Sequence, residues 1–208
     1  MASGRKKSFS ESEALVAAMQ VFWAKGYVGA SLSDLTKSMG INKPSMYSAF
    51  GNKEALFIQT TQLYIENSEQ KHAKFLSEQN TPLAQRIKNH MASIVLTQCE
   101  SSHPKGCYLV LCQSEVVGGA IPEAASKVLN NARVDGQKKL TDFFSNDVES
   151  IELGLNKNAE EHALCIMTTL RGTATMARAG TAYNELEAVI DNTLRGIGLL
   201  PCKAKITH

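Results

Sequence analysis

Hydrophobic residues recur every three or four positions along most of this chain, which is the spacing of one face of an α-helix. The single-residue alternation of a half-buried strand is almost absent, and only five prolines interrupt 208 residues. We therefore predict an all-α fold: an N-terminal three-helix head containing a helix-turn-helix, followed by a larger helical body.

The stretch from residue 31 to residue 50 predicts two short helices joined by a tight turn. Ser31 is a good N-cap for the first helix. Gly40 suits the end of that helix, because glycine adopts a positive φ without steric cost. Asn42 can cap the second helix, with Pro44 in its first turn, where a missing N–H does no harm. Each helix is too short to stand alone, so both need a third helix to pack against.

That third helix is predicted upstream, between an N-cap at Ser10 and a stop at Gly26. Its apolar stripe contains Leu15, Met19, Phe22 and Trp23. A rigid three-helix head that presents one exposed polar helix is commonly used to read DNA in the major groove. The open alternative is an all-helical protein-interaction module whose helix-turn-helix is purely structural.

The side chains expected to contact DNA are polar or small and lie on or near the second helix. Lysines neutralise phosphates, hydroxyls donate hydrogen bonds to them, and a proline ring can touch a thymine methyl group. These criteria select Ser31, Lys43, Pro44, Ser45, Tyr47, Ser48 and Lys53. A basic N-terminal arm at Arg5, Lys6 and Lys7 is a further candidate, for the adjacent minor groove.

Charge along the chain agrees modestly with DNA binding. The formal net charge is only +2, but residues 1–60 hold seven Lys or Arg against four acids, which is +3. Positive charge is therefore concentrated in the head, as phosphate contact requires.

The residues of this head resemble the tetracycline-repressor (TetR) family of bacterial transcription regulators. The resemblance rests on FWAKGYVGASLSDLTKSMGINKPSMYSAFGNKEALF, residues 22–57. The chain departs from many members at Ser48, where they carry a histidine. The resemblance implies a cytoplasmic, homodimeric repressor. It would read a palindromic operator and be released by a small-molecule inducer or by thiol modification.

Domain organisation follows from these patterns. We expect a DNA-binding domain at residues 1–52 and a regulatory domain at residues 53–208. The body should contain helices at about residues 53–78, 82–98, 105–117, 121–144, 158–180 and 184–197. Periodicity leaves open whether the last two pack within the chain or against a second subunit. The resemblance implies the latter, as a four-helix bundle.

Among the five cysteines, Cys107 has the most suggestive setting. We expect it in the first turn of a helix, near Lys105, and both features favour the thiolate. Some family members that sense electrophiles and oxidants carry a similar Gly-Cys step there. The alternative is a buried, inert cysteine of the core.

An inducer pocket is expected among the middle helices, with walls of Met91, Ile94, Val95, Tyr108, Leu111 and Met167 favouring a mostly apolar ligand. We expect no cofactor and no metal, since the spacing of Cys99, His103, Cys107 and Cys112 matches no zinc motif. Sequence motifs of hydrolases, nucleotide-binding enzymes and zinc proteases are absent. A thiol enzyme using Cys107 and His103 would leave the head unexplained. The charged N-terminus lacks the apolar core of a secretory signal.

Overall fold

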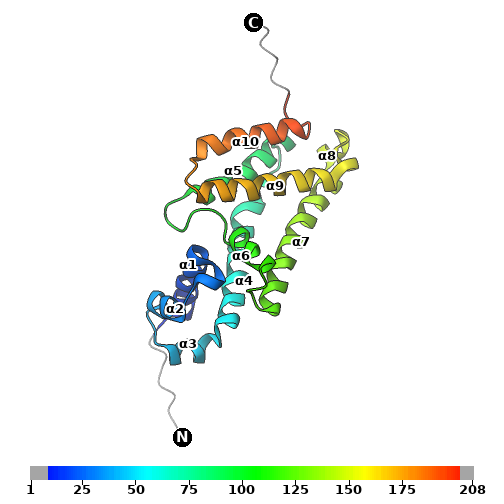
Figure 1. Ribbon diagram of the computed structural model, residues 1–208. Helices are drawn as coiled ribbons and strands as arrows, with labels where there is room; N and C mark the ends of the chain where they lie inside the picture. The colour runs from blue at the N-terminus through cyan, green and yellow to red at the C-terminus, as the bar shows by residue number, and fades with distance from the viewer. Residues whose placement is uncertain (1–8, 202–208) are drawn as a thin grey trace.

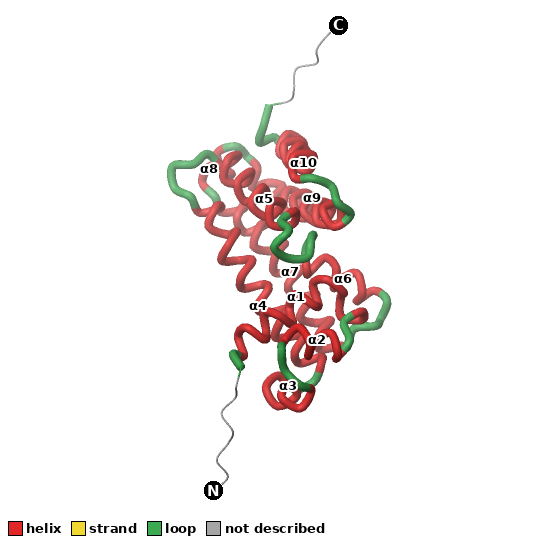
Figure 2. Tube along the Cα trace, turned by 90° about the vertical axis from the view of Figure 1, so that its left-hand side faces the viewer, coloured by secondary structure: helices red, strands yellow, loops and turns green. Residues whose placement is uncertain are grey.

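The computed structural model describes residues 9–201, and all regular elements in that range are helices (Figure 2). The head comprises α1 (Glu11–Gly29), α2 (Leu32–Met39) and α3 (Lys43–Phe50). The helix α4 (Lys53–His72), extended by a 3-10 turn at Ala73–Ser77, leaves the head and enters the body. The body contains α5 (Leu83–Cys99), α6 (Tyr108–Val117), α7 (Glu123–Asn146), α8 (Val148–Glu152), a 3-10 turn at Leu155–Asn158, α9 (Ala159–Arg178) and α10 (Tyr183–Gly196).

The molecule is elongated (Figure 1). Helices α2 and α3 lie at one end, and α9 and α10 lie at the other. Helices α4 and α7 run between them. None of the helices in residues 9–201 is long and apolar enough to cross a membrane.

The caps predicted for the head are confirmed. The Ser31 hydroxyl accepts from the Asp34 amide, and the Asp34 carboxylate accepts from the Ser31 amide in return. Gly40 ends α2 with φ of 64°, in the left-handed region that glycine tolerates best. The Asn42 side chain caps α3 by accepting from the Ser45 amide at 2.9 Å. These local bonds satisfy helix-end donors that packing cannot reach.

Two expected helix starts in the body are wrong, and a third is right but lacks the expected capping bond. Helix α6 begins at Tyr108 and not at Lys105, so Cys107 is its N-cap and lies before the first turn. Helix α10 begins at Tyr183, and its cap is made by the Glu185 carboxylate accepting from the backbone N–H of Ala182. Asn158 precedes α9 but makes no side-chain capping bond. A polar residue near a helix start is a common cap, but tertiary packing decides which of several candidates is used.

The molecule has two hydrophobic cores, and their boundary does not coincide with the boundary between head and body in the sequence. The first joins α1, α2 and α3 to the start of α4, to α6 and to the start of α7. The second joins α5, the end of α7, α9 and α10. The head is therefore packed directly against part of the body, and its orientation depends on where α4 and α6 lie.

Helix α1 is broken at Gly26, where φ is 73° and ψ is 179°. The break leaves carbonyl groups of the preceding turn without helical partners. Arg178, at the end of α9, donates to two of them: to the carbonyl oxygen of Ala24 at 2.6 Å and to that of Trp23 at 3.1 Å. One guanidinium thus ties the head to a helix at the far end of the body.

Glu115 of α6 holds the other side of the same break. Its carboxylate accepts from the amide of Tyr27 at 2.7 Å and from that of Val28 at 3.4 Å. A β-carbon on Gly26 would push this carboxylate out of its place, and the positive φ of this position favours glycine. We call Glu115 and Arg178, with the α1 break that they hold, the head clamp.

Replacing Glu115 by Ala should lower the free energy of unfolding by about 1–3 kcal/mol, because two amides, one of them partly buried, lose their acceptor. Urea unfolding followed by circular dichroism measures the change. The exposed Glu66 of α4 provides a matched control, and Glu66→Ala should stay within about 0.5 kcal/mol of the parent. Equal effects of the two substitutions would show that the clamp contributes nothing to stability.

Candidate DNA-binding face and ligand cavity

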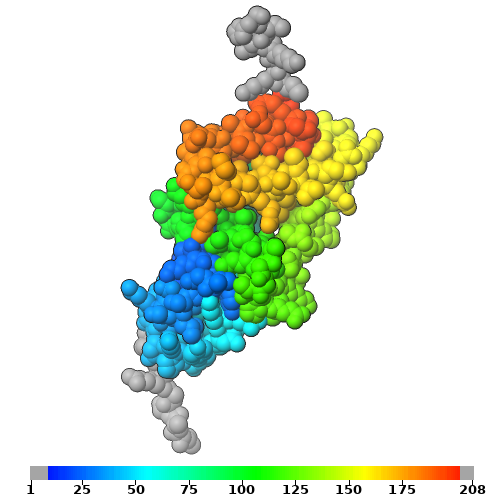
Figure 3. Space-filling view, viewed as in Figure 1, coloured from blue at the N-terminus to red at the C-terminus, as the bar shows by residue number. Residues whose placement is uncertain are grey.

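Helix α3 presents a polar face at the tip of the head. Met46 and Phe50 are buried and anchor it, whereas Lys43 and Ser48 are exposed and Tyr47 is 46% exposed. In the space-filling view the region of α2 and α3 forms the lower end of the molecule, away from the body (Figure 3). No other element of residues 9–201 covers the exposed side chains of this face, so the described part of the molecule leaves it free to enter a groove.

The remaining candidate DNA contacts lie around the same tip but differ in their availability. Pro44 is exposed in the first turn of α3, and Ser45 is partly exposed. The Ser31 hydroxyl donates to the Asp34 carboxylate at 2.7 Å, so a phosphate would have to compete for its proton. Lys53 lies over the ring of Tyr27, with Nζ 4.4 Å from the ring centroid, and burial lowers its pKa.

The basic arm at Arg5, Lys6 and Lys7 lies outside the described residues, as does Cys202.

An aromatic cluster joins the head to the body just behind the clamp. Trp23 of α1 stacks on His103 with ring centroids 4.2 Å apart and meets Tyr64 of α4 edge-on at 5.1 Å. Tyr64 in turn stacks on Tyr108 of α6 at 5.1 Å. Rings packed this way cannot move singly without opening voids. A displacement of α4 or α6 is therefore transmitted to α1.

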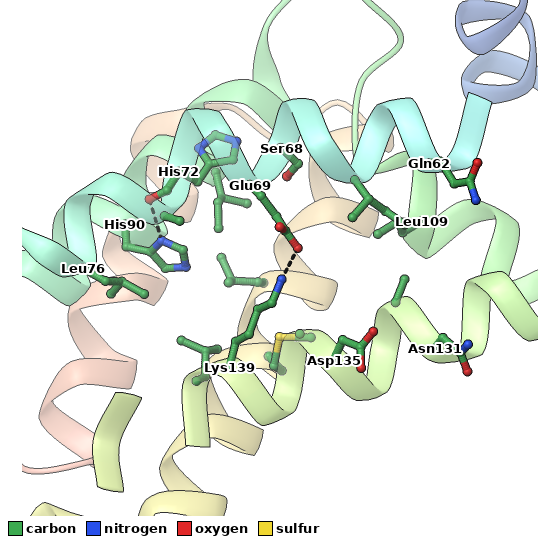
Figure 4. Close-up of a pocket in the computed structure, with 18 of the residues that line it drawn as sticks. Gln62, Ser68, Glu69, His72, Leu76, His90, Leu109, Asn131, Asp135 and Lys139 are labelled. Atoms are coloured by element: carbon green, nitrogen blue, oxygen red, sulfur yellow. Dashed lines mark hydrogen bonds and ion pairs between the residues drawn. The ribbon is translucent and has the colours of Figure 1, made fainter. Parts of the chain in front are cut away.

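A cavity of about 470 Å³ lies in the body, between α4 and α7 (Figure 4). That size suits a drug-like or metabolite-sized molecule. Its apolar walls include Ile65, Leu76, Ile94, Leu109, Val128, Leu140, Met167 and Leu170. A salt bridge between Glu69 of α4 and Lys139 of α7 bridges the two helices.

Two histidines give this cavity a polar end. His90 Nδ1 lies 3.0 Å from the carbonyl oxygen of His72, and His72 Nδ1 lies 2.9 Å from the Ser93 hydroxyl. Burial lowers the pKa of His72 to about 4 and lowers the pKa of His90 as well. Both rings are therefore neutral near pH 7 and present one donor and one acceptor nitrogen each.

The cavity walls differ from the expected set. Ile94 and Met167 line the cavity, whereas four residues do not: Met91, Val95, Tyr108 and Leu111. Met91 and Val95 are fully buried in the second core, and Tyr108 in the first. From α6, Leu109 lines the cavity in place of Tyr108 and Leu111. Periodicity identifies the inward side of a helix but does not distinguish a core from a cavity.

Cys107 lines a second cavity of about 150 Å³, which shares His72, Ile94 and Met167 with the first. Its sulfur accepts a hydrogen bond from the Tyr64 hydroxyl at 3.4 Å. The neighbouring Cys112 is fully buried, and burial raises its pKa, which makes it unreactive. Cys107 thus lies between the ligand cavities and the aromatic cluster. No group of residues within 9–201 could hold a metal ion.

Sequence comparison identifies relatives across most of the chain. A family profile described as bacterial regulatory proteins, tetR family, matches residues 14–60. The chain is 25% identical to the HTH-type transcriptional repressor ComR of Escherichia coli K12 over 194 residues, covering 92% of this chain and 90% of that protein. It is 39% identical to the HTH-type transcriptional repressor BdcR of the same organism over 62 residues, which are 30% of this chain and 32% of BdcR.

Solved structures agree with the sequence relatives. A cysteine mutant of the TetR family transcriptional regulator CifR, complexed with 26-bp double-strand operator DNA, matches with a TM-score of 0.79 and 28% identity, over 92% of this chain and 98% of CifR. The reduced form of Escherichia coli NemR shares the fold, with a TM-score of 0.67 and 17% identity over 87% of this chain and 94% of NemR.

The helix-turn-helix head, the helical body and these relatives lead to one conclusion. Residues 14–60 match the tetR family of bacterial regulatory proteins, and the chain is similar over most of its length to helix-turn-helix transcriptional regulators.

Proposed function

We propose that this protein is a cytoplasmic homodimeric repressor that binds a palindromic operator through α3 and is released when a ligand fills the α4–α7 cavity or when Cys107 is modified. The exposed polar face of α3, carried at the tip of a packed three-helix head, is the observation that supports this most directly. The operator complex of CifR supports it by analogy.

The proposed contacts to DNA divide by chemistry. Lys43 and Lys53 neutralise phosphates, and the hydroxyls of Ser31, Ser45, Tyr47 and Ser48 donate hydrogen bonds. Pro44 offers an apolar surface to a thymine methyl group. Two heads related by a twofold axis would enter successive major grooves, about 34–36 Å apart.

Dimerisation is proposed through the outer faces of α9 and α10. Exposed side chains of α9 are mostly small or apolar along its length: Leu164, Cys165, Thr168, Gly172, Thr175 and Met176. On α10 the exposed Ala188 and Val189 continue the same character. Small residues let helices of two subunits approach closely, and a surface this poor in charge is typical of an interface core.

Release is proposed to occur by population shift between two body shapes. A ligand between α4 and α7 favours the shape with these helices further apart, and α4 carries the head. The head clamp and the aromatic cluster then reorient α1, so that the two copies of α3 no longer fit successive grooves.

The proposal as a whole is tested by fragment selection from DNA flanking the protein's own gene, followed by a salt titration of the selected site. We expect a protected palindrome and a linear, steep fall of log affinity with log salt. Equal, weak binding to all fragments would favour the alternative, a helical interaction module.

Replacing Tyr47 by Ala should weaken operator binding by roughly ten- to a hundredfold, because each of two heads loses one contact worth about 1 kcal/mol. Fluorescence anisotropy with labelled operator measures the loss. Dimer mass and thermal melting should be unchanged, since the side chain is 46% exposed. Tyr47→Phe separates the hydroxyl from the ring. A Tyr47→Ala protein that fails to fold would identify this residue as part of the core.

The dimer face is tested with Met176→Glu, which places a charge on α9 where the side chain is 50% exposed. Sedimentation should show a shift toward monomer, because an unpaired charge would be buried in the interface. Val134 of α7 is 51% exposed and provides the control, so Val134→Glu should stay dimeric. If both variants remain dimeric, the dimer interface lies elsewhere.

Thiol sensing is tested by adding N-ethylmaleimide to the operator complex. A bulky group on Cys107 would displace Tyr64, which packs on both Trp23 and Tyr108, so the wild-type protein should dissociate. Cys107→Ser should remain bound, whereas Cys99→Ser, which removes a partly exposed cysteine at the end of α5, should respond like wild type. Dissociation of the Cys107→Ser complex would remove Cys107 as the sensor.

A further inference from the structure

We propose that the α4–α7 cavity takes a neutral, elongated, mostly apolar molecule whose terminal hydroxyl donates a hydrogen bond to Nε2 of His90. The inference deepens the proposed function, on which it rests, because it names the chemical class of the inducer.

The shape of the cavity sets the length of the ligand. Figure 4 shows His90 and Leu76 at one end of the cavity and Gln62 and Asn131 at the other, with α4 along one side and α7 along the opposite side. Gln62 and His72 are ten residues apart on α4, which corresponds to about 15 Å along the helix axis. An elongated molecule lying parallel to α4 would therefore span from the histidine end to the amide end.

The hydrogen bond of His90 fixes which of its nitrogens faces the ligand. A carbonyl oxygen only accepts, so Nδ1 of His90, 3.0 Å from the His72 oxygen, must carry the proton. In the neutral ring Nε2 is then an acceptor. Figure 4 shows this second nitrogen turned toward the cavity. A lone pair at the end of an apolar cavity calls for a hydrogen-bond donor on the ligand.

The contacts of Ser93 show that His72, like His90, carries its proton on Nδ1. The Ser93 hydroxyl donates its one proton to the carbonyl oxygen of His90 at 2.9 Å. It can satisfy its second contact, 2.9 Å from His72 Nδ1, only by accepting. The chain His72–Ser93–His90 thus locks both rings with Nδ1 protonated and leaves each Nε2 as an acceptor.

Charges around the cavity argue against an acidic ligand. Lys139 is already paired with Glu69, and Asp135 adds a second carboxylate to the lining. A carboxylate or carbonyl at the histidine end would require His90 to break its bond to His72 or to become protonated. Burial opposes protonation, because it lowers the pKa of both histidines. A neutral hydroxyl meets none of these costs.

The test compares two probes that differ in one proton: 4-hexylphenol, which carries the donor, and 4-hexylanisole, in which a methyl group replaces it. Isothermal titration on the full-length protein should show about tenfold tighter binding of the phenol, since the anisole leaves a buried acceptor unpaired. In His90→Phe the preference should fall to about twofold or less. His90→Met serves the same purpose should the phenylalanine variant not fold.

His162 supplies the matched control, because it lies on α9 against Phe144 and is not part of the cavity lining. His162→Phe should keep the full preference for the phenol. The proposal is overturned by equal binding of both probes to wild type, by binding of neither, or by a preference that survives in both His90 variants. The affinity of the wild-type protein for its operator is measured in parallel, without probe. If the protein does not bind the operator, the proposed function is contradicted, but the result with the two probes still stands.

Discussion

The head clamp fixes the orientation of the head relative to the body, and the rest of the structure depends on this. A helix broken at Gly26 exposes carbonyls on one side and amides on the other, and the body supplies a cation for the first and an anion for the second. Arg178 comes from α9 and Glu115 from α6, so the two ends of the break are tied to different parts of the body. The head cannot rotate freely on α4. Its orientation reports the relative positions of α6 and α9.

The α4–α7 cavity and Cys107 both lie close to the elements that hold the head clamp. The cavity separates α4 from α7, and Cys107 lies at the start of α6, beside Tyr64. Tyr64 contacts Trp23, whose own carbonyl is held by Arg178. A small displacement at either site therefore reaches α1 through packed rings and hydrogen bonds. Close packing makes such a network switch between discrete arrangements and does not let it deform continuously.

The sequence predicted the head far better than the body, for physical reasons. Caps such as Ser31 and Asn42 act within a few residues, so their pattern is visible in the chain, and the all-α class followed from periodicity alone. The polar end of the cavity is formed by His72 and His90, which belong to different helices and do not form a recognisable sequence motif. The clamp likewise unites residues 88 positions apart. Long-range contacts of this kind leave no local signature in the sequence.

Coupled movement of head and body can be followed at Trp23, the one tryptophan in the chain. It is 4% exposed and lies at the joint between α1, α4 and the loop before α6. Protein labelled with 5-fluorotryptophan gives a single fluorine resonance in solution. If head and body move together, the resonance has one position in operator-bound protein. It has a different position after release by cavity occupation or by alkylation of Cys107. The same position in both states would contradict this coupled movement, because release would then leave the joint unmoved.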